Sequence, residues 1–228
     1  LNKNQINSNS DFEILLDSGS GKILADSVLY YDSNLNTVRD LIFNLVDHQI
    51  DFAEEKGTKY LIAMDFCKKN TYKNEEGRSL KYSNIIDSLL SDQGIQNKLL
   101  LKTLELAHQK KSKLKIFAPI HGQDHDDFLN HYNSIIELER QSKYNFSGFA
   151  LGGLGSLSAG KIGMIVKEIR QTGEQRDLHI LGSSGISKLP VLISAGANFF
   201  DCHTPWRRAN DADSKFCMPL LNSKLEII

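Results

Sequence analysis

The chain has 228 residues, of which 40% are hydrophobic and 24% are charged, and its formal net charge is -1. These values are ordinary for a globular protein and exclude a surface coated in positive charge, although they allow a local basic groove. The longest apolar runs fall short of the roughly 18 residues that span a bilayer, and the first residues do not form a signal-like segment. We therefore expect one domain over residues 1–228, a cytoplasmic location and no membrane partner.

Three cysteines occur in the sequence, at Cys67, Cys202 and Cys217. Their positions show neither CxxC nor CxC spacing, which argues against a disulfide framework and against a cysteine zinc site. The expected state is buried, reduced thiols, and no metal is expected.

Short apolar runs alternate with longer helical patterns along the chain. In order, these patterns predict a strand at 13–17, a helix at 38–50, a strand at 60–65, a helical segment at 85–106 that Gly94 could interrupt, a strand at 115–120, a helix at 128–136, a strand at 148–151, a helix at 162–169, a strand at 178–181, a short helix between Ser187 and Gly196, and a strand at 198–201. This alternation is typical of repeated β/α units around a parallel sheet.

Six such units are two fewer than a closed eightfold barrel contains. A truncated start, a strand hidden in residues 1–12 or 217–228, or an open doubly wound sheet would each account for the difference. We favour an α/β fold of the TIM-type (β/α)8 barrel class, either incomplete or truncated at its N-terminus.

Three of the predicted strands end in a carboxylate, at Asp17, Asp65 and Asp201. In a parallel β/α fold, the carboxyl ends of the strands share one edge, where the loops converge on a ligand. A single aspartate at a strand end is usually a turn former or a helix cap. Three aspartates on the same rim give a functional role the same weight as a structural one.

Other strand ends carry polar or glycine-rich segments. The pair Gly152–Gly153 is either an ordinary left-handed turn or a place where a planar ligand meets bare backbone. Around His121, Asp124 and His125, we favour a polar rim over a metal site. The segment LGSSGIS (181–187) could hold a phosphate, which supports a rival function: a barrel lyase or isomerase of a small phosphorylated metabolite.

A group of cations and one tryptophan follow the acidic strand ends, where they suit the binding of a nucleic-acid backbone and base. Trp206 could equally be a core residue. The group consists of Lys68, Lys69, Lys73, Trp206, Arg207 and Arg208.

Taken in order, five segments resemble the tRNA-guanine transglycosylase superfamily, which includes the related enzymes that insert 7-deazaguanines into DNA. The family motifs DSGG, AFDEC, VQG, GGL and FDC are similar to residues 17–20, 63–67, 120–122, 152–154 and 200–202. Their order and spacing agree across residues 13–209, so the resemblance covers most of the chain.

The resemblance implies a pentosyltransferase of the β/α-barrel type that exchanges guanine for a 7-deazaguanine without a cofactor. Asp201 would be the nucleophile at the sugar C1′, and Asp17 the general acid and base. Asp65 would accept hydrogen bonds from guanine. The rest of the substrate site would comprise Ser18, His121, Gly152, Gly153 and Leu154.

Three departures from the family pattern shape these expectations. His121 stands where the family has glutamine, so the incoming base could differ. The first two barrel strands have no evident counterpart, which suggests a missing start or a partner subunit, including a homodimer. The family's cysteine-and-histidine zinc site is absent, so we favour DNA over tRNA as the polymer. A tRNA-guanine transglycosylase proper, and a catalytically silent subunit that binds nucleic acid, remain alternatives.

Overall fold

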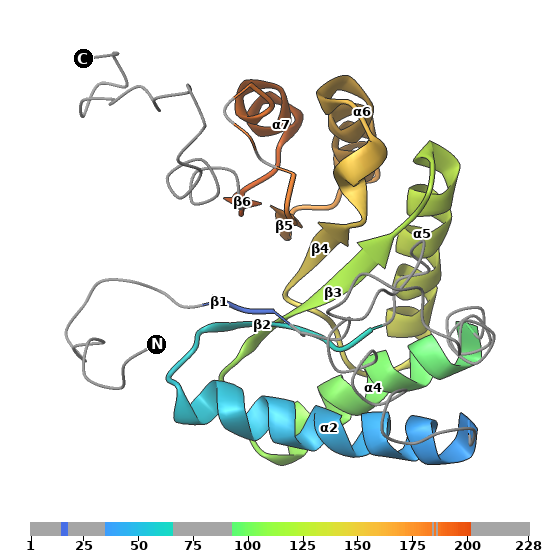
Figure 1. The fold of residues 1–228 in the computed structure, drawn as a ribbon, viewed down its shortest axis with the longest axis vertical. Coiled ribbons are helices and arrows are strands. Elements are labelled where there is room, and N and C mark those ends of the chain that lie inside the picture. Colours follow the sequence, from blue (N-terminus) through green and yellow to red (C-terminus); the bar gives the residue numbers. More distant parts are fainter. Residues whose placement is uncertain (1–14, 18–34, 66–92, 184, 186, 202–228) are drawn as a thin grey trace, which may run out of the picture.

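The computed structural model describes residues 15–17, 35–65, 93–183, 185 and 187–201 (Figure 1). Their strands form one sheet whose spatial order is the chain order, and every neighbouring pair is parallel. The strands are β1 (Leu15–Leu16), β2 (Tyr60–Ile62), β3 (Lys115–His121), β4 (Gly148–Gly152), β5 (Asp177–Ile180) and β6 (Phe199–Phe200).

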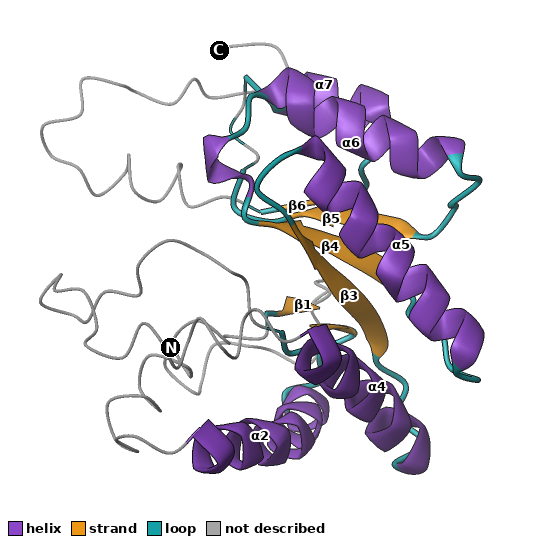
Figure 2. Cartoon of the chain, turned by 90° about the vertical axis from the view of Figure 1, so that its right-hand side faces the viewer, coloured by secondary structure: helices purple, strands orange, loops and turns teal. Residues whose placement is uncertain are grey.

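The helices lie on the convex side of this curved sheet, as Figures 1 and 2 show from two directions. They are α2 (Leu35–Glu55), α4 (Gln93–Gln109), α5 (His125–Gln141), the 3-10 turn η1 (Leu154–Ser156), α6 (Ala159–Gln171) and α7 (Leu189–Ala195). None of the described helices is both long enough and apolar enough to cross a membrane.

Local sequence explains where several helices begin and end. The Asp124 carboxylate accepts the backbone N–H of Asp127, and the Ser158 hydroxyl accepts that of Lys161, so each caps a helix N-terminus. Helix α7 ends at Gly196, whose φ of 105° is a left-handed conformation that glycine adopts without strain. The predicted stop at Gly196 is confirmed.

The alternation of side chains along each strand divides the core into two layers. Outward residues such as Leu61 and Phe149 pack with the helices in one continuous apolar cluster. Inward residues form a second cluster made of Tyr60, Ile62, Phe117 and Ala150, with Leu15, Leu181 and Phe199 against it.

The sheet is strongly curved, because side chains of distant strands meet on its inner face. The ring centroids of Tyr60 in β2 and Phe199 in β6 are 5.2 Å apart, and Phe117 lies 5.7 Å from both. Edge-to-face contacts of this kind are favourable beyond the area they bury. The inner face is therefore filled with side chains, as in a barrel, and is not an open channel.

The structure is an α/β fold with a six-stranded parallel half-barrel among the residues described. The alternative of a doubly wound sheet is wrong, because such a sheet reverses its strand order and carries helices on both faces. The expected strands and helices are found, with shifted ends.

Most elements begin or end a few residues away from the expected bounds, and β2, α4 and α7 are three examples. Strand β2 stops at Ile62 rather than at residue 65, and the turn at Ser187 and Lys188 precedes α7. Gly94 lies in the first turn of α4, while residues 85–92 are outside the described part.

Candidate active site

The predicted site residues that the structure describes lie along the carboxyl edge of the half-barrel. Since β1, β3, β4 and β6 all run parallel in one sheet, their last residues lie at the same edge. Counting by two from the inner cluster places on the inward face the residues Asp17, His121, Gly152 and Asp201. Two of the expected acids, Asp17 and Asp201, therefore follow strands at this edge on the inward face.

The carboxylate of Asp201 is contacted by His179 of the neighbouring strand β5 and by Gly182 in the loop that follows it. The backbone N–H of Gly182 lies 3.2 Å and 3.1 Å from its two oxygens, and Nε2 of His179 lies 2.9 Å from Oδ1. The Asp201 side chain is nevertheless 45% exposed. An ionised carboxylate that is fixed on one side and accessible on the other suits a nucleophile.

A second carboxylate–imidazole pair forms at the ends of β2 and β3, where Asp65 Oδ2 contacts Nε2 of His121. Here the carboxylate is the deeper partner, since the side chain of Asp65 is 8% exposed and that of His121 is 16% exposed. The two residues expected to recognise guanine are therefore brought together, with the imidazole nearer to solvent.

Gly152 provides the surface on which the His121 ring lies. A Cβ atom at position 152 would be 2.4 Å from Cε1 and 2.7 Å from Nδ1 of His121, closer than real contacts allow. Glycine is thus required here by a neighbouring side chain, while Gly153 adopts the left-handed conformation with a φ of 77°.

His131 in α5 supports His121 from behind the sheet. The backbone N–H of His121 donates to Nδ1 of His131 at 3.0 Å. Burial lowers the pKa of His131 below its usual value, and the nearby His121 lowers it further. A neutral His131 keeps Nδ1 available as the acceptor of this hydrogen bond.

His179 is the site residue that sequence reasoning missed. It is buried in the middle of β5, where it pairs in register with Ala150 and Phe199. Its position could have been inferred from the alternation of the strand, because His179 lies two residues before the inward-facing Leu181. The next strand, β6, leads directly to Asp201. A histidine inside an apolar strand does not by itself show which carboxylate it meets.

The contacts of Leu154 and of the expected polar rim bear on two further expectations. The side chain of Leu154 packs in the outer core, so only its backbone could face a ligand. His121, Asp124 and His125 do not form one polar rim. His125 contacts Asp126 and Glu168 on the helices, whereas His121 contacts Asp65. Within the described ranges, no group of three or more His, Cys, Asp or Glu side chains is placed to hold a metal ion.

The remaining predicted site residues lie outside the described residues. They are Ser18, Lys68, Lys69, Lys73, Trp206, Arg207 and Arg208, together with all three cysteines.

The loop after β5 uses its described donors internally. Besides the Gly182 N–H, which serves Asp201, Nζ of Lys188 donates to Oγ of Ser183 at 2.9 Å and to the carbonyl of Leu157 at 3.3 Å. These contacts tie the loop to the turn after β4 and leave Lys188 already engaged.

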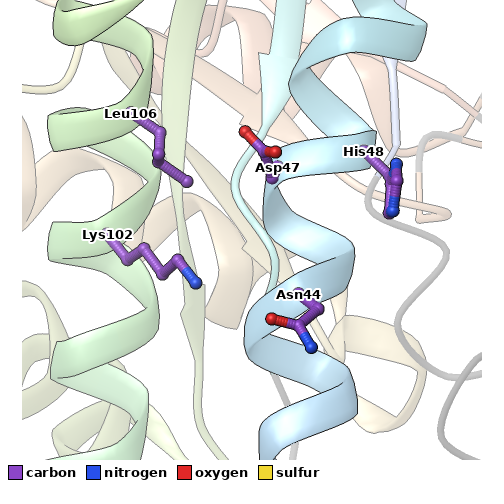
Figure 3. A pocket seen from close by; sticks show the side chains of 5 residues that line it. All are labelled: Asn44, Asp47, His48, Lys102 and Leu106. Carbon is purple, nitrogen blue, oxygen red and sulfur yellow. The ribbon is translucent and has the colours of Figure 1, made fainter.

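A surface hollow also lies between α2 and α4, on the helical layer (Figure 3). It is lined by Asn44, Asp47, His48, Lys102 and Leu106. Its residues come from the middle of two helices rather than from strand ends, so it is separate from the site at the sheet edge.

No family model matches the chain. Over 169 residues the chain is 27% identical to GTPase Der of Campylobacter concisus (strain 13826), a match that covers 71% of this chain and 31% of that protein. The chain therefore spans about a third of the length of this curated relative.

Solved structures with partial similarity are enzymes of several kinds. A Burkholderia cenocepacia J2315 protein assigned as a phosphonomutase has a TM-score of 0.45 and 12% identity, covering 88% of this chain and 66% of its own. The carboxyl transferase domain of Rhizobium etli pyruvate carboxylase, with 3-bromopyruvate, has a TM-score of 0.45 and 15% identity, covering 70% and 23%. At these TM-scores and identities, the activities of the similar structures are not assigned to this chain.

Proposed function

We propose that this chain is a base-exchange transglycosylase that replaces guanine in a polynucleotide, DNA in preference to tRNA, with a 7-deazaguanine. The observation that carries the proposal is Asp201, whose carboxylate is contacted by His179 and Gly182 while its side chain is 45% exposed. Asp17 and the Asp65–His121 pair lie at the same edge of the sheet, in the order that the transglycosylase resemblance requires.

In the proposed first step, one oxygen of Asp201 attacks C1′ of the target nucleotide. The C1′–N9 bond breaks, and Asp17 supplies the proton that the departing guanine takes up. In the second step the incoming base loses its proton to Asp17 and attacks C1′, so that the bond to Asp201 breaks. Two displacements at one carbon retain its configuration.

Asp65 would select guanine by accepting from its N1–H and its exocyclic amine, a pair of donors that adenine lacks. A carboxylate offers about four lone-pair positions, so Asp65 can contact His121 and accept from a base at once. The target nucleotide must leave its stack to reach this edge.

The direct test is the release of labelled guanine from DNA and from tRNA when 7-cyano-7-deazaguanine is supplied. The proposal expects release that depends on the added base, with more release from DNA. Release from tRNA alone would identify a tRNA-guanine transglycosylase proper. No release from either polymer would remove the proposal.

The rival function, a lyase or isomerase of a phosphorylated metabolite, has one feature in its favour. Gly182, Ser183 and Lys188 lie in a loop at the carboxyl edge, where barrel enzymes hold phosphate. Because these groups already serve Asp201 and one another, phosphate would have to displace existing hydrogen bonds. A rise in melting temperature with a small sugar phosphate, without guanine release, would favour this rival.

GTP binding is not part of the proposal, despite the similarity to a GTPase. The segment GSLSAGKI (155–162) follows β4 and leads into α6, but it has Ile162 where the phosphate-loop motif GxxxxGK[ST] needs a hydroxyl for magnesium. Ile162 is fully buried, and Ser158 already accepts the N–H of Lys161 at the helix start.

A further inference from the structure

The environment of His179 differs from that of an ordinary core histidine. Its side chain is 5% exposed, and Nε2 lies 2.9 Å from Oδ1 of Asp201. The other ring nitrogen, Nδ1, is buried and has no hydrogen-bond partner among the described residues. Since a carboxylate only accepts, Nε2 is the ring nitrogen that carries a proton toward Asp201.

The ring is held in place by its neighbours on both sides. His179 is in register with Ala150 of β4 and Phe199 of β6, and its ring centroid lies 6.2 Å from that of Phe199. It therefore approaches Asp201 from within a packed layer, with little freedom to turn. A donor fixed in this way also limits the rotation of the carboxylate that it contacts.

Gly182 supplies a donor of a different kind. Its N–H is nearly equidistant from both oxygens of Asp201, at 3.2 Å and 3.1 Å, so it holds the carboxylate without selecting one oxygen. Nε2 of His179, by contrast, lies close to one oxygen, Oδ1, at 2.9 Å. The imidazole therefore contributes to the direction in which the carboxylate faces.

We infer that His179 is a positioning residue, which orients the Asp201 carboxylate for its attack on the sugar. This inference rests on the proposed function, because it assigns His179 a role in the covalent step. His179 does not touch the substrate in this account. Its effect is on the rate at which Asp201 forms the bond to C1′, and not on the affinity for the polymer.

The test compares His179→Leu with His179→Gln. Leucine fills the apolar site without a donor, whereas the amide of glutamine places an N–H near the position of Nε2. The unchanged protein and both variants are incubated with guanine-containing DNA below the lowest of their three melting temperatures. The single-turnover rate of covalent adduct formation and the Kd for DNA are measured for each.

We expect His179→Leu to slow adduct formation by about 10- to 100-fold, the effect of losing one close polar contact with a charged group. DNA affinity should change less than threefold, and His179→Gln should recover most of the rate. Equal rates in the leucine and glutamine variants would overturn the inference while leaving the proposed function intact. The absence of an adduct with the unchanged protein would instead overturn the proposed function.

Discussion

His121 covers Asp65 at the ends of two neighbouring strands, so that the imidazole, and not the carboxylate, is the more exposed member of the pair. The second pair is arranged in the opposite way, because Asp201 is exposed and His179 is buried behind it. The two aspartates therefore suit the different roles proposed for them, which are recognition of the base by Asp65 and attack on the sugar by Asp201.

The first prediction concerns recognition by Asp65. Asp65→Asn turns one acceptor oxygen into a donor and should weaken binding of a 7-deazaguanine base by about 10- to 100-fold, since hydrogen bonds to a charged group are lost. His121→Gln, which restores the residue of the resembling family, should change affinity less than tenfold. Isothermal titration of both variants checks this. Unaltered affinity in Asp65→Asn would exclude this carboxylate from base recognition.

The second prediction uses the packing of Gly152 against His121. Gly152→Ala places a Cβ atom 2.4 Å from the ring, so the imidazole must shift away from Asp65, and base binding should weaken more than tenfold. Gly160→Ala is the matched control, because a Cβ there meets nothing within 4 Å. In that control we expect unchanged binding and a stability gain of up to about 1 kcal/mol. If both alanine variants bind the base equally well, the position of the His121 ring does not affect base binding.

The sequence predicted which elements exist and roughly where they lie, because apolar runs and helical spacing report burial directly. It placed Asp17 and Asp201 directly after strands for the same reason, and Asp65 three residues beyond one. It could not predict the pairs they form. The contact of Asp65 with His121, and of Asp201 with His179, depends on the register between strands, which is set by the packing of the whole sheet.

The third prediction concerns the start of β5, where Arg176 contacts Glu139 and Glu174, each at 2.7 Å. Burial alone would raise the pKa of Glu174, but its hydrogen bonds with Arg176 outweigh this and lower the pKa. The ionised form is thus favoured in the folded state, and its contribution to stability is lost as the pH falls below about 4.5.

Urea unfolding of Glu174→Gln should show a loss of roughly 1.5–3 kcal/mol at neutral pH, and a smaller decline in stability on acidification than the unchanged protein. Glu137→Gln removes the exposed contact with Arg140 and should cost less than about 1 kcal/mol. Similar losses of stability in the two variants would contradict the claim that the buried contact of Glu174 with Arg176 contributes more than the exposed contact of Glu137 with Arg140.

The fourth prediction concerns His131, whose pKa is lowered by burial and by His121. The folded protein favours the neutral ring more strongly than the unfolded chain does. The free energy of unfolding is therefore fully retained above about pH 6.5 and decreases as the pH falls through the lowered pKa. His131→Gln should flatten the decline in stability below pH 6.5 in urea unfolding. His48→Gln, on the exposed face of α2, should leave the decline unchanged. Identical pH profiles for His131→Gln and the unchanged protein would refute the assignment.

The most direct measurement of the central claim is the trapping of a covalent adduct between the protein and guanine-containing DNA or tRNA on a denaturing gel. The account predicts an adduct that is lost in Asp201→Asn and retained in Lys110→Ala, which alters only a surface contact with Asp47 and Asp51. Melting temperatures confirm that both variants fold. An adduct that persists in Asp201→Asn, or one that never forms with either polymer, would contradict the assignment of Asp201 as the nucleophile.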